Sequence, residues 1–515
     1  MKILLVSLNN YEVNRGLLYL PLGLYYLRGY LMKHDLLRRA VSCKIKTYNS
    51  SISNRELLRS ILSERSQIVG FSCWCWNILQ ILEVSHLVKK VDPSIKIILG
   101  GPQASSIKES EALLQSSEAI DIVAHGEGEI TFTKLIQPLL TGEPSLHDIE
   151  GISFREGLKI KRANRIPPFA NLDDIPLDIS SEEIQAFDLN KTVFLLETQR
   201  GCPFKCKFCY YRKGYQRVRF FSAEKVKENI KFLLDNGVKR LYLADPTFNI
   251  NLKRAKEILR FIVDQEKEII LNTEIKAEFV DEEFGKLLFQ AGTKFLDVGL
   301  QSINPRALEA MGRNLNQETF EKGIQVLKGE KIVFQIQLIL GLPGDNYEYF
   351  CKSLNYALHL VDNNWGLIEV FPLELIPGSE FFDKSLEFGI IHEKSPPYYV
   401  IQTSTFSLED IAKAEELTNS VKGIYSSSLL RALSNSLQQQ PTEIAVNWSN
   451  WLCENLGFTV NQFNSEGIFN RIRYFTEFVK NCNLKHGVRK NISVIRIYLI
   501  LVHECFRYLL NRASS

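Results

Sequence analysis

Three cysteines of the chain, Cys202, Cys206 and Cys209, lie within eight residues of one another. Three thiolates on one loop suit a four-iron, four-sulfur cluster that leaves one iron atom without a protein ligand. A structural zinc site normally has four protein ligands, and no fourth cysteine or histidine lies near these three in the sequence. The spacing therefore favours one [4Fe–4S] cluster. A zinc site completed by a distant residue and a chance grouping in a loop stay open as alternatives.

Basic residues surround the cysteines, and no acidic residue lies between positions 200 and 219. The seven basic residues are Arg200, Lys205, Lys207, Arg212, Lys213, Arg217 and Arg219. Such a positive field raises the potential of a cluster and favours docking of an acidic electron donor such as flavodoxin or ferredoxin. Two alternatives stay open: a solvated face, and stacking of nucleic-acid bases on Phe204, Phe208, Tyr210, Tyr211 and Tyr215.

The cysteines follow the first strand of a repeated strand–helix pattern. Six strands are predicted, at 193–198, 240–244, 270–275, 295–300, 333–340 and 368–375. Helical segments separate them, such as 223–235, which has Val226 and Ile230 on one side and Asn236-Gly237 as its stop. Six βα units in succession predict a partial (β/α)6 barrel of the TIM type, in which the loops after the strands carry the chemistry.

An earlier stretch predicts a separate, Rossmann-like sheet with parallel strands at 2–8, 43–48, 68–73, 95–99 and 120–124. In a doubly wound sheet, ligands bind at the carboxyl ends of the strands, so a large, flat cofactor fits across that edge. The residues expected near that edge are Ser72, Trp74, Trp76, Asn77, Gly100, Gly101, Pro102, Gln103, Gly126 and Glu127.

The complete prediction is an α/β protein in four parts. The Rossmann-like domain covers 1–140, and a connector with a hairpin at 152–162 covers 141–192. The partial barrel covers 193–394. A carboxyl-terminal helical domain covers 395–515, with helices expected at 408–430, 442–456, 468–479 and 494–510.

Composition narrows the class of protein further. The 515 residues are 45% hydrophobic and 23% charged, which is typical of a multidomain globular protein. A net charge of +3 gives no global field for nucleic acid or an anionic membrane, so any binding of that kind must be local, and we do not expect nucleic acid as a partner. No apolar stretch near the start is long enough to span a bilayer, and no signal-peptide cleavage site follows residues 1–8, so we expect a cytoplasmic protein.

The cysteine triplet, with Phe208 directly before its last cysteine, resembles the radical S-adenosylmethionine (SAM) superfamily. The resemblance covers residues 193 to about 380 and implies that the amino and carboxylate groups of SAM bind the fourth iron. It also implies that reduction then cleaves SAM to a 5′-deoxyadenosyl radical. The positions that match SAM contacts of the family are Ala244, Asp245, Pro246, Glu274, Gln301, Ser302, Arg313, Gln337 and Leu375.

The first domain is similar to the cobalamin-binding domains that precede some radical SAM barrels, and the resemblance adds Leu22 and Gly23 to the expected cofactor contacts. Glycines at its sheet edge allow close approach of a corrin ring to the backbone. The chain lacks the DxHxxG pattern of better-known cobalamin domains, so the resemblance implies that no protein histidine lies beneath cobalt. Trp74 or Trp76 is expected to cover that face, with core packing of both as the alternative. His125 is expected to be a structural, hydrogen-bonded residue.

These resemblances imply a cobalamin-dependent radical SAM enzyme, and we expect a methyltransferase acting on an unactivated carbon. In that scheme one SAM methylates cobalamin, a second gives the radical that abstracts substrate hydrogen, and the substrate radical takes the methyl group. The substrate is expected to be a small molecule, a lipid or a peptide. Cyclisation or rearrangement without methyl transfer is one alternative, and a non-catalytic SAM or cobalamin sensor is another.

Overall fold

The computed structural model describes residues 1–10, 16–163, 169, 171–211, 217–361, 365–423, 430, 433–435, 437–465 and 468–485. The chain forms two compact units. Unit 1 contains Met1–Leu296, Glu374–Ser385 and His392–Tyr399, and unit 2 contains Asp297–Leu373, Leu386–Ile391 and Val400–Ser515. Among the described residues, no helix has both the length and the apolar character needed to cross a bilayer.

Unit 1 begins with a seven-stranded sheet in the order β3-β1-β4-β5-β6-β7-β8. Its parallel strands are β1 (Lys2–Asn9), β3 (Ser42–Asn49), β4 (Ile68–Ser72), β5 (Lys96–Gly100) and β6 (Ile122–Ala124). All five predicted strands are confirmed, with differences only at their ends. Burial explains the continuous apolar runs of β1, β4 and β5, because strands covered on both faces are apolar throughout, whereas β3 at the edge of the sheet is partly exposed and alternates.

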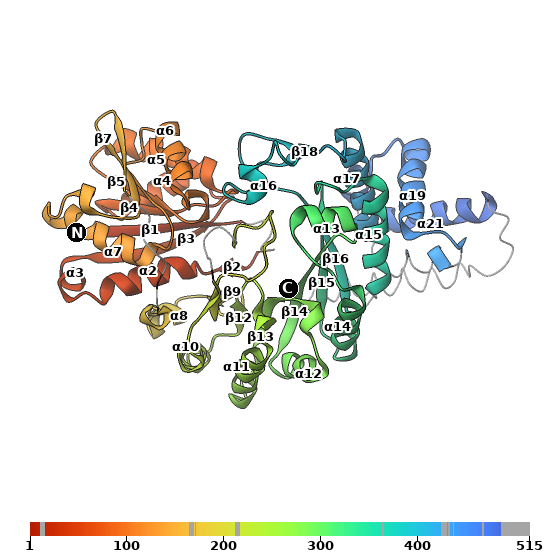
Figure 1. Cartoon of the computed structure of the whole chain (residues 1–515), viewed down its shortest axis with the longest axis horizontal. Helices are drawn as coiled ribbons and strands as arrows, with labels where there is room; N and C mark the ends of the chain where they lie inside the picture. Colours follow the sequence, from red (N-terminus) through yellow and green to blue (C-terminus); the bar gives the residue numbers. More distant parts are fainter. Residues whose placement is uncertain are drawn as a thin grey trace. The chain divides into compact units, whose positions relative to one another are not determined.

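Helices cover both faces of this sheet (Figure 1). One face carries α4 (Asn54–Ser63), α5 (Ile78–Val91) and α6 (Ile107–Ser116). The other carries α2 (Leu22–Met32), α3 (Asp35–Ala40) and α7 (Gly128–Thr141). Helix α4 illustrates the local cause: a capping box of Ser53 and Glu56 starts it, and Leu57 and Ile61, one turn apart, are buried against the sheet.

The hairpin expected in the connector belongs to the first sheet. It consists of β7 (Ile152–Glu156) and β8 (Lys159–Arg162), and β7 pairs antiparallel with β6. The hairpin therefore covers the edge of β6, which the connector prediction did not foresee. The predicted domain boundaries stay predictions.

Unit 1 also contains the start of the second sheet, in the order β13-β12-β9-β2. These strands are β2 (Leu18–Tyr19), β9 (Thr192–Leu196), β12 (Arg240–Leu243) and β13 (Ile270–Ile275), and they are parallel. The short strands β10 (Gln199–Arg200) and β11 (Arg219–Phe220) pair antiparallel beside the cysteine loop. The unit's other elements are η1 (Pro102–Ala104), η2 (Leu146–Asp148), η3 (Leu172–Asp174), α8 (Ser181–Gln185), α10 (Ala223–Asp235), η4 (Phe248–Ile250), α11 (Leu252–Asp264), η5 (Ala277–Phe279), α12 (Glu282–Gln290) and α16 (Glu380–Asp383).

Strand β14 (Thr293–Gln301) begins in unit 1 and ends in unit 2, where the strand order is β16-β15-β14. Strands β15 (Phe334–Leu340) and β16 (Gly366–Pro372) are parallel, and β17 (Ile391–His392) and β18 (Val400–Gln402) follow. The helices of unit 2 are α13 (Pro305–Met311), α14 (Gln317–Gly329), α15 (Tyr347–Leu360), α17 (Leu408–Gly423), α19 (Pro441–Leu456), α20 (Val460–Ser465) and α21 (Ile468–Lys485). The six barrel strands and the helical carboxyl-terminal region are confirmed, whereas the helix predicted at 494–510 lies outside the described residues.

Two loops at the carboxyl edge of the first sheet approach each other closely at Gly101. This residue has φ +105° and ψ −175°, a region open essentially to glycine alone. A Cβ atom placed there lies 2.9 Å from the carbonyl oxygen of Cys73 and 3.0 Å from its nitrogen. Glycine at 101 therefore sets the spacing between the loop after β4 and the loop after β5.

We predict that Gly101→Ala destabilises the protein by about 1–3 kcal/mol, the cost of a strained backbone, with the Cys73 clash added to it. Gly157→Ala is the matched control, because Gly157 also has a positive φ (+59°) but faces open space. Urea unfolding of the two variants checks this, and the loss is expected to be larger for Gly101→Ala. An equal loss for both would show that the close approach to Cys73 contributes nothing.

Candidate functional site

The cysteine loop follows β9 and is held by its neighbours. Cys206 is buried, Cys202 and Cys209 are half-buried, and the Cys209 amide donates to the Cys206 carbonyl at 3.1 Å. The ring of Phe204 stacks on Phe279, with 6.3 Å between centroids, and the Lys276 ammonium lies 4.8 Å from the Phe204 centroid. The loop after β13 thus packs directly on the loop that carries the thiols.

The chemistry of these donors fits an iron–sulfur cluster. Among the described residues, no three His, Cys, Asp or Glu side chains meet at one point as the ligands of a single metal ion do. A cluster does not require such a meeting point, because each cysteine binds a different iron atom. Burial raises the pKa of the Cys209 thiol to about 12, with added repulsion from Cys206, Cys202 and Glu274. Iron bound there would offset that cost, since a coordinating thiol loses its proton.

Asp245, at the end of β12, ties two loops of the site together. Its Oδ1 accepts hydrogen bonds from the backbone amides of Thr198 (2.7 Å) and Gln199 (3.1 Å). Its Oδ2 accepts one from the Thr198 hydroxyl at 2.6 Å. The carboxyl group is fully buried, and this burial raises its pKa to about 7 although the three hydrogen bonds oppose the shift. Asp245 was predicted as a SAM contact, and its oxygens are engaged with the chain that leads to the cysteines.

The residues beside Asp245 reach the cysteine loop. The Ala244 amide donates to the Leu196 carbonyl at 2.8 Å, and the Pro246 carbonyl accepts the hydroxyl of Thr247. That hydroxyl lies 4.0 Å from the Cys202 sulfur. The structure therefore brings Ala244, Asp245 and Pro246 next to the cysteine triplet.

Glu274 is exposed at the end of β13 and accepts a hydrogen bond from the Tyr242 hydroxyl at 3.1 Å. Its charge acts on Cys209, so it also faces the cysteine loop. Leu375 is fully buried, and its amide donates to the Tyr398 carbonyl at 3.0 Å. Phe208, before the last cysteine, is half-buried.

Four predicted SAM contacts lie in unit 2. Gln301, at the end of β14, has φ +72°, and Arg313 donates to the carbonyl of Gly299 two residues earlier in that strand. The buried Ser302 hydroxyl donates to Asp345 at 3.1 Å. Gln337 on β15 donates to Asp297 at 2.9 Å, and burial raises the pKa of Asp297 to about 6. These residues gather at β14, β15 and the loops after them.

The two tryptophans after β4 stack on each other, with 4.6 Å between ring centroids and 17° between planes. Trp74 is 37% exposed and Trp76 is 44% exposed, so the alternative that both pack in the core is wrong. The buried Asn77 side chain fixes the loop that carries them. Its Oδ1 accepts a hydrogen bond from the Trp74 amide at 2.8 Å, and its Nδ2 donates one to the Ser72 carbonyl at 3.1 Å. An exposed apolar pair held by a buried amide is typical of a binding surface.

Other edge residues have structural partners. The Gln103 amide donates to the Tyr398 hydroxyl at 2.7 Å in a buried contact, and the Cys73 amide donates to the Gly100 carbonyl at 2.7 Å. Pro102 starts η1, Gly126 has φ +83°, and Leu22 and Gly23 open α2. His125 is buried, and its backbone amide donates to the Gly151 carbonyl at 2.9 Å. A structural role of its ring stays a prediction.

Glu127 does not present a vacant carboxylate to a cofactor. Its oxygens accept from both terminal nitrogens of Arg219, from Arg200 at 3.3 Å and from the Phe169 amide at 2.7 Å. Arg200 also pairs with Glu129 and Glu197, each at 2.7 Å.

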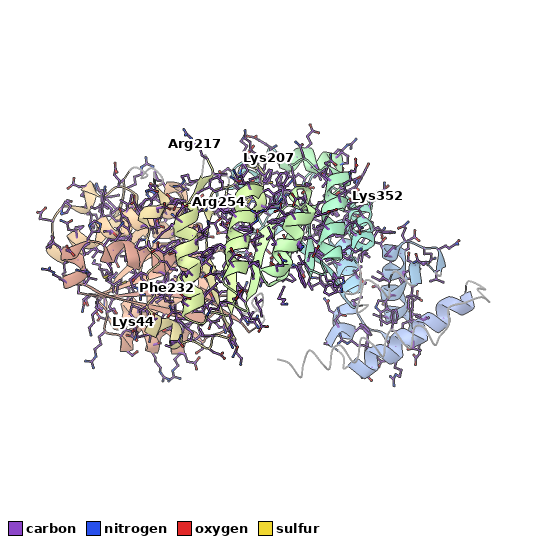
Figure 2. The ribbon with its side chains drawn as sticks, turned by 90° about the horizontal axis from the view of Figure 1, so that it is seen from below. Lys44, Lys207, Arg217, Phe232, Arg254 and Lys352 are labelled. Carbon is purple, nitrogen blue, oxygen red and sulfur yellow. The ribbon has the colours of Figure 1, made fainter. Side chains whose placement is uncertain are left out.

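The positive field around the cysteines is therefore smaller than the sequence count predicts, because glutamates distant in sequence neutralise Arg200 and Arg219. Lys207 and Arg217 lie toward the same edge of the ribbon in the view of Figure 2. Arg212 and Lys213 of the positive field, and the aromatic residue Tyr215, lie outside the described residues. Docking of an acidic electron donor stays a prediction.

Sequence reasoning missed several residues of this region. Glu129 and Glu197 complete the pairing of Arg200, and Glu374 accepts a contact from the Cys75 thiol at 3.7 Å. Tyr398 binds Gln103. The sequence carries one weak signal, the repeated Gly-Glu pairs at 126–129, and none for Glu374 or Tyr398, which follow the last barrel strand.

Comparison with known proteins gives two family matches. Residues 196–357 match the Radical SAM superfamily, and residues 12–136 match the B12 binding domain. The first match contains the cysteine loop and Asp245. The second contains the stacked tryptophans and Glu127.

Two curated relatives and one solved structure are similar to this chain. The cobalamin-dependent radical SAM methyltransferase TokK of Streptomyces tokunonensis is 25% identical over 397 residues, which is 73% of this chain and 56% of TokK. The anaerobic magnesium-protoporphyrin IX monomethyl ester cyclase of Rubrivivax gelatinosus is 25% identical over 340 residues, which is 64% of this chain and 61% of the cyclase. The chain thus spans less than two thirds of either relative.

The structure of OxsB, a cobalamin-dependent SAM radical enzyme with aqua-cobalamin and SAM bound, has a TM-score of 0.63 at 15% identity. The match covers 98% of this chain and 83% of OxsB. It confirms the predicted α/β fold class, with a Rossmann-like sheet, a parallel half-barrel and carboxyl-terminal helices.

We predict that Asp245→Asn removes a pH dependence of stability. The folded protein holds the Asp245 proton more tightly than the unfolded chain, whose aspartate has a pKa of 3.8. The free energy of unfolding therefore falls as pH rises from about 4 to about 7, by up to about 4 kcal/mol, and does not fall further above that range. Asparagine keeps the amide contacts of Oδ1 and stays uncharged.

Anaerobic urea unfolding between pH 4 and 8 checks this, with Asp235→Asn at the end of α10 as a surface control. The decrease of the free energy of unfolding with rising pH is expected to be smaller in Asp245→Asn than in the wild type, and unchanged in Asp235→Asn. A wild-type slope that survives in Asp245→Asn would contradict the assignment.

Proposed function

We propose that this chain, which belongs to the radical SAM superfamily and carries an amino-terminal B12-binding domain, is a methyltransferase acting on an unactivated carbon. The substrate class proposed is a small molecule, a lipid or a peptide. The observation that carries the proposal is the presence, in one compact unit, of the cysteine loop and an exposed tryptophan pair, each after a parallel strand. A parallel strand end is where α/β proteins bind ligands.

The enzyme uses a [4Fe–4S] cluster, SAM and cobalamin. When bound, the cluster delivers an electron that cleaves SAM, and cobalamin carries a methyl group. In our proposal Cys202, Cys206 and Cys209 hold the cluster. Phe204 and Phe279, stacked beside them, pack the loop after β13 against the cysteine loop.

The proposed SAM contacts fall into two groups. Backbone groups at Ala244 and Pro246 and the exposed carboxylate of Glu274 face the cysteine loop from β12 and β13. Gln301, Ser302, Arg313 and Gln337 belong to unit 2. Asp245, whose oxygens are taken up by Thr198 and Gln199, orients the loop rather than binding SAM directly.

The proposed cobalamin site is the carboxyl edge of the first sheet. Trp74 and Trp76 offer an apolar surface for one face of the corrin ring, and Gly100 and Gly101 allow the backbone to come close. Asn77 acts indirectly, since its amide is engaged with Trp74 and Ser72, and the Nε2 of Gln103 is engaged with Tyr398.

The second candidate is a radical cyclisation or rearrangement without methyl transfer, and the similarity to a cyclase favours it over a non-catalytic sensor. Both candidates share the same cofactors. They differ in the fate of the SAM methyl group, which an assay can follow directly.

We predict that alanine at any position of the triplet abolishes cluster binding and SAM cleavage, because each thiolate holds one iron. Anaerobically reconstituted wild type should contain about four iron atoms per chain, and Cys202→Ala much less. Cys43→Ala, at a half-buried cysteine on β3, is the control and should keep its iron. Tetrahedral zinc in anaerobically purified protein, or full activity of Cys202→Ala, would refute the cluster assignment.

We also predict that reduced holoprotein converts SAM into two products. Methyl transfer from SAM leaves S-adenosylhomocysteine, whereas reductive cleavage leaves methionine and 5′-deoxyadenosine. Chromatography of reactions with and without hydroxocobalamin checks this. S-Adenosylhomocysteine that depends on cobalamin supports methyl transfer. Formation of 5′-deoxyadenosine alone supports the cyclase-like candidate, and neither product supports a sensor.

A further inference from the structure

A buried guanidinium joins the loop of the cysteines to the B12-binding domain. Arg200 lies two residues before Cys202, and its side chain is 7% exposed. It donates to Glu197 at 2.8 Å through Nε, to Glu127 at 3.3 Å through Nη1 and to Glu129 at 2.7 Å through Nη2. All three nitrogens of the guanidinium thus have carboxylate acceptors.

The acceptors come from separate parts of unit 1. Glu127 and Glu129 flank Gly128 at the start of α7, directly after the loop that follows β6 of the first sheet. Glu197 directly follows β9 of the second sheet. One side chain therefore connects the proposed cobalamin edge to the proposed cluster loop.

Two further contacts make the junction rigid. The Arg200 guanidinium lies over the ring of Tyr26 on α2, 5.6 Å from its centroid. Arg219, on the strand that pairs with β10, donates through both terminal nitrogens to Glu127. The planar guanidinium of an arginine, when it donates to several carboxylates at once, fixes both their distance and their orientation relative to it. The single ammonium of a lysine does not fix the orientation.

The charges around Arg200 also indicate that it fixes one geometry rather than stabilises the fold. Two arginines face three glutamates whose side chains are between 5% and 17% exposed, and one oxygen of Glu129 has no hydrogen-bond partner among the described residues. Buried ion pairs of this kind stabilise a fold poorly compared with apolar packing, whereas they specify one geometry. A junction kept for stability alone would be better built from leucines.

We propose that Arg200 is a positioning residue that sets the cysteine loop relative to the α7 end of the B12-binding domain, and so couples the environments of the two cofactors. The inference depends on the two cofactors and not on the reaction that they perform. It holds equally for a methyltransferase and a cyclase.

The test compares Arg200→Lys with Arg28→Lys, a matched change in the same unit. Arg28 on α2 is also largely buried and binds two acids, Asp178 and Glu183, at 2.7 Å each, but those acids lie on and before α8. Both variants keep the positive charge but lose the planar guanidinium and its fixed donor directions. Three quantities are measured anaerobically: iron content, the electron paramagnetic resonance spectrum of the reduced cluster with SAM, and the affinity for hydroxocobalamin.

We expect Arg200→Lys to keep its iron, to broaden the SAM-bound cluster spectrum and to weaken hydroxocobalamin binding about tenfold, as loss of an outer support does at metal sites. Glu129→Gln, on the cobalamin side of the junction, should change the cluster spectrum in the same way. Arg28→Lys should change thermal stability only.

The proposal is overturned if Arg200→Lys leaves both cofactor signals unchanged, or if Arg28→Lys shifts them equally. If Arg200→Lys does not fold, Glu129→Gln is the deciding variant. A cluster spectrum of Glu129→Gln that is identical to the wild-type spectrum would contradict the coupling. Failure of methyl transfer would leave these measurements unaffected.

Discussion

The direction of the chain before the cysteines depends on one buried carboxyl group. Asp245 gathers the amides of Thr198 and Gln199 and the Thr198 hydroxyl at the point where β9 ends. The cysteine loop itself has little regular secondary structure. Ordering such a segment costs conformational entropy at every residue, so its support has to come from neighbouring strands. Asp245 on one side and the Phe204–Phe279 stack on the other provide that support.

The loops at the edge of the first sheet are ordered in a different way, without charged groups. They are short, and they are fixed by the close approach at Gly101 and by the buried side-chain amides of Asn77 and Gln103. What they hold outward is apolar, namely the stacked rings of Trp74 and Trp76. Exposing two tryptophans carries a hydration cost that a bound flat molecule removes. One loop system thus organises thiols and the other organises a hydrophobic surface.

The regular elements were predictable because their signals are local. Apolar runs located the strands of both sheets, and helix caps such as Ser222 before α10 mark where helices begin. The pairing of the hairpin with β6 and the addition of β2 to the second sheet were not predictable, since strand neighbours are chosen by tertiary packing. Two of the three glutamates that pair with Arg200 lie 71 and 73 positions away from it, outside any local charge count. Exposure of the tryptophans is likewise a property of the folded surface.

The return of residues 374–385 and 392–399 to unit 1 affects how the protein is made in the cell. The Gln103–Tyr398 hydrogen bond joins positions 295 residues apart, and the amide of Phe381 donates to the carbonyl of Lys207 between two cysteines. At translation speeds of about 5–20 residues per second, the ribosome needs about 20–80 s to reach this segment. Until then the nascent amino-terminal domain lacks part of its surface. The hydrogen bonds of Gln103 and of the cysteine loop with this segment therefore form only after residues 374–399 have been synthesised.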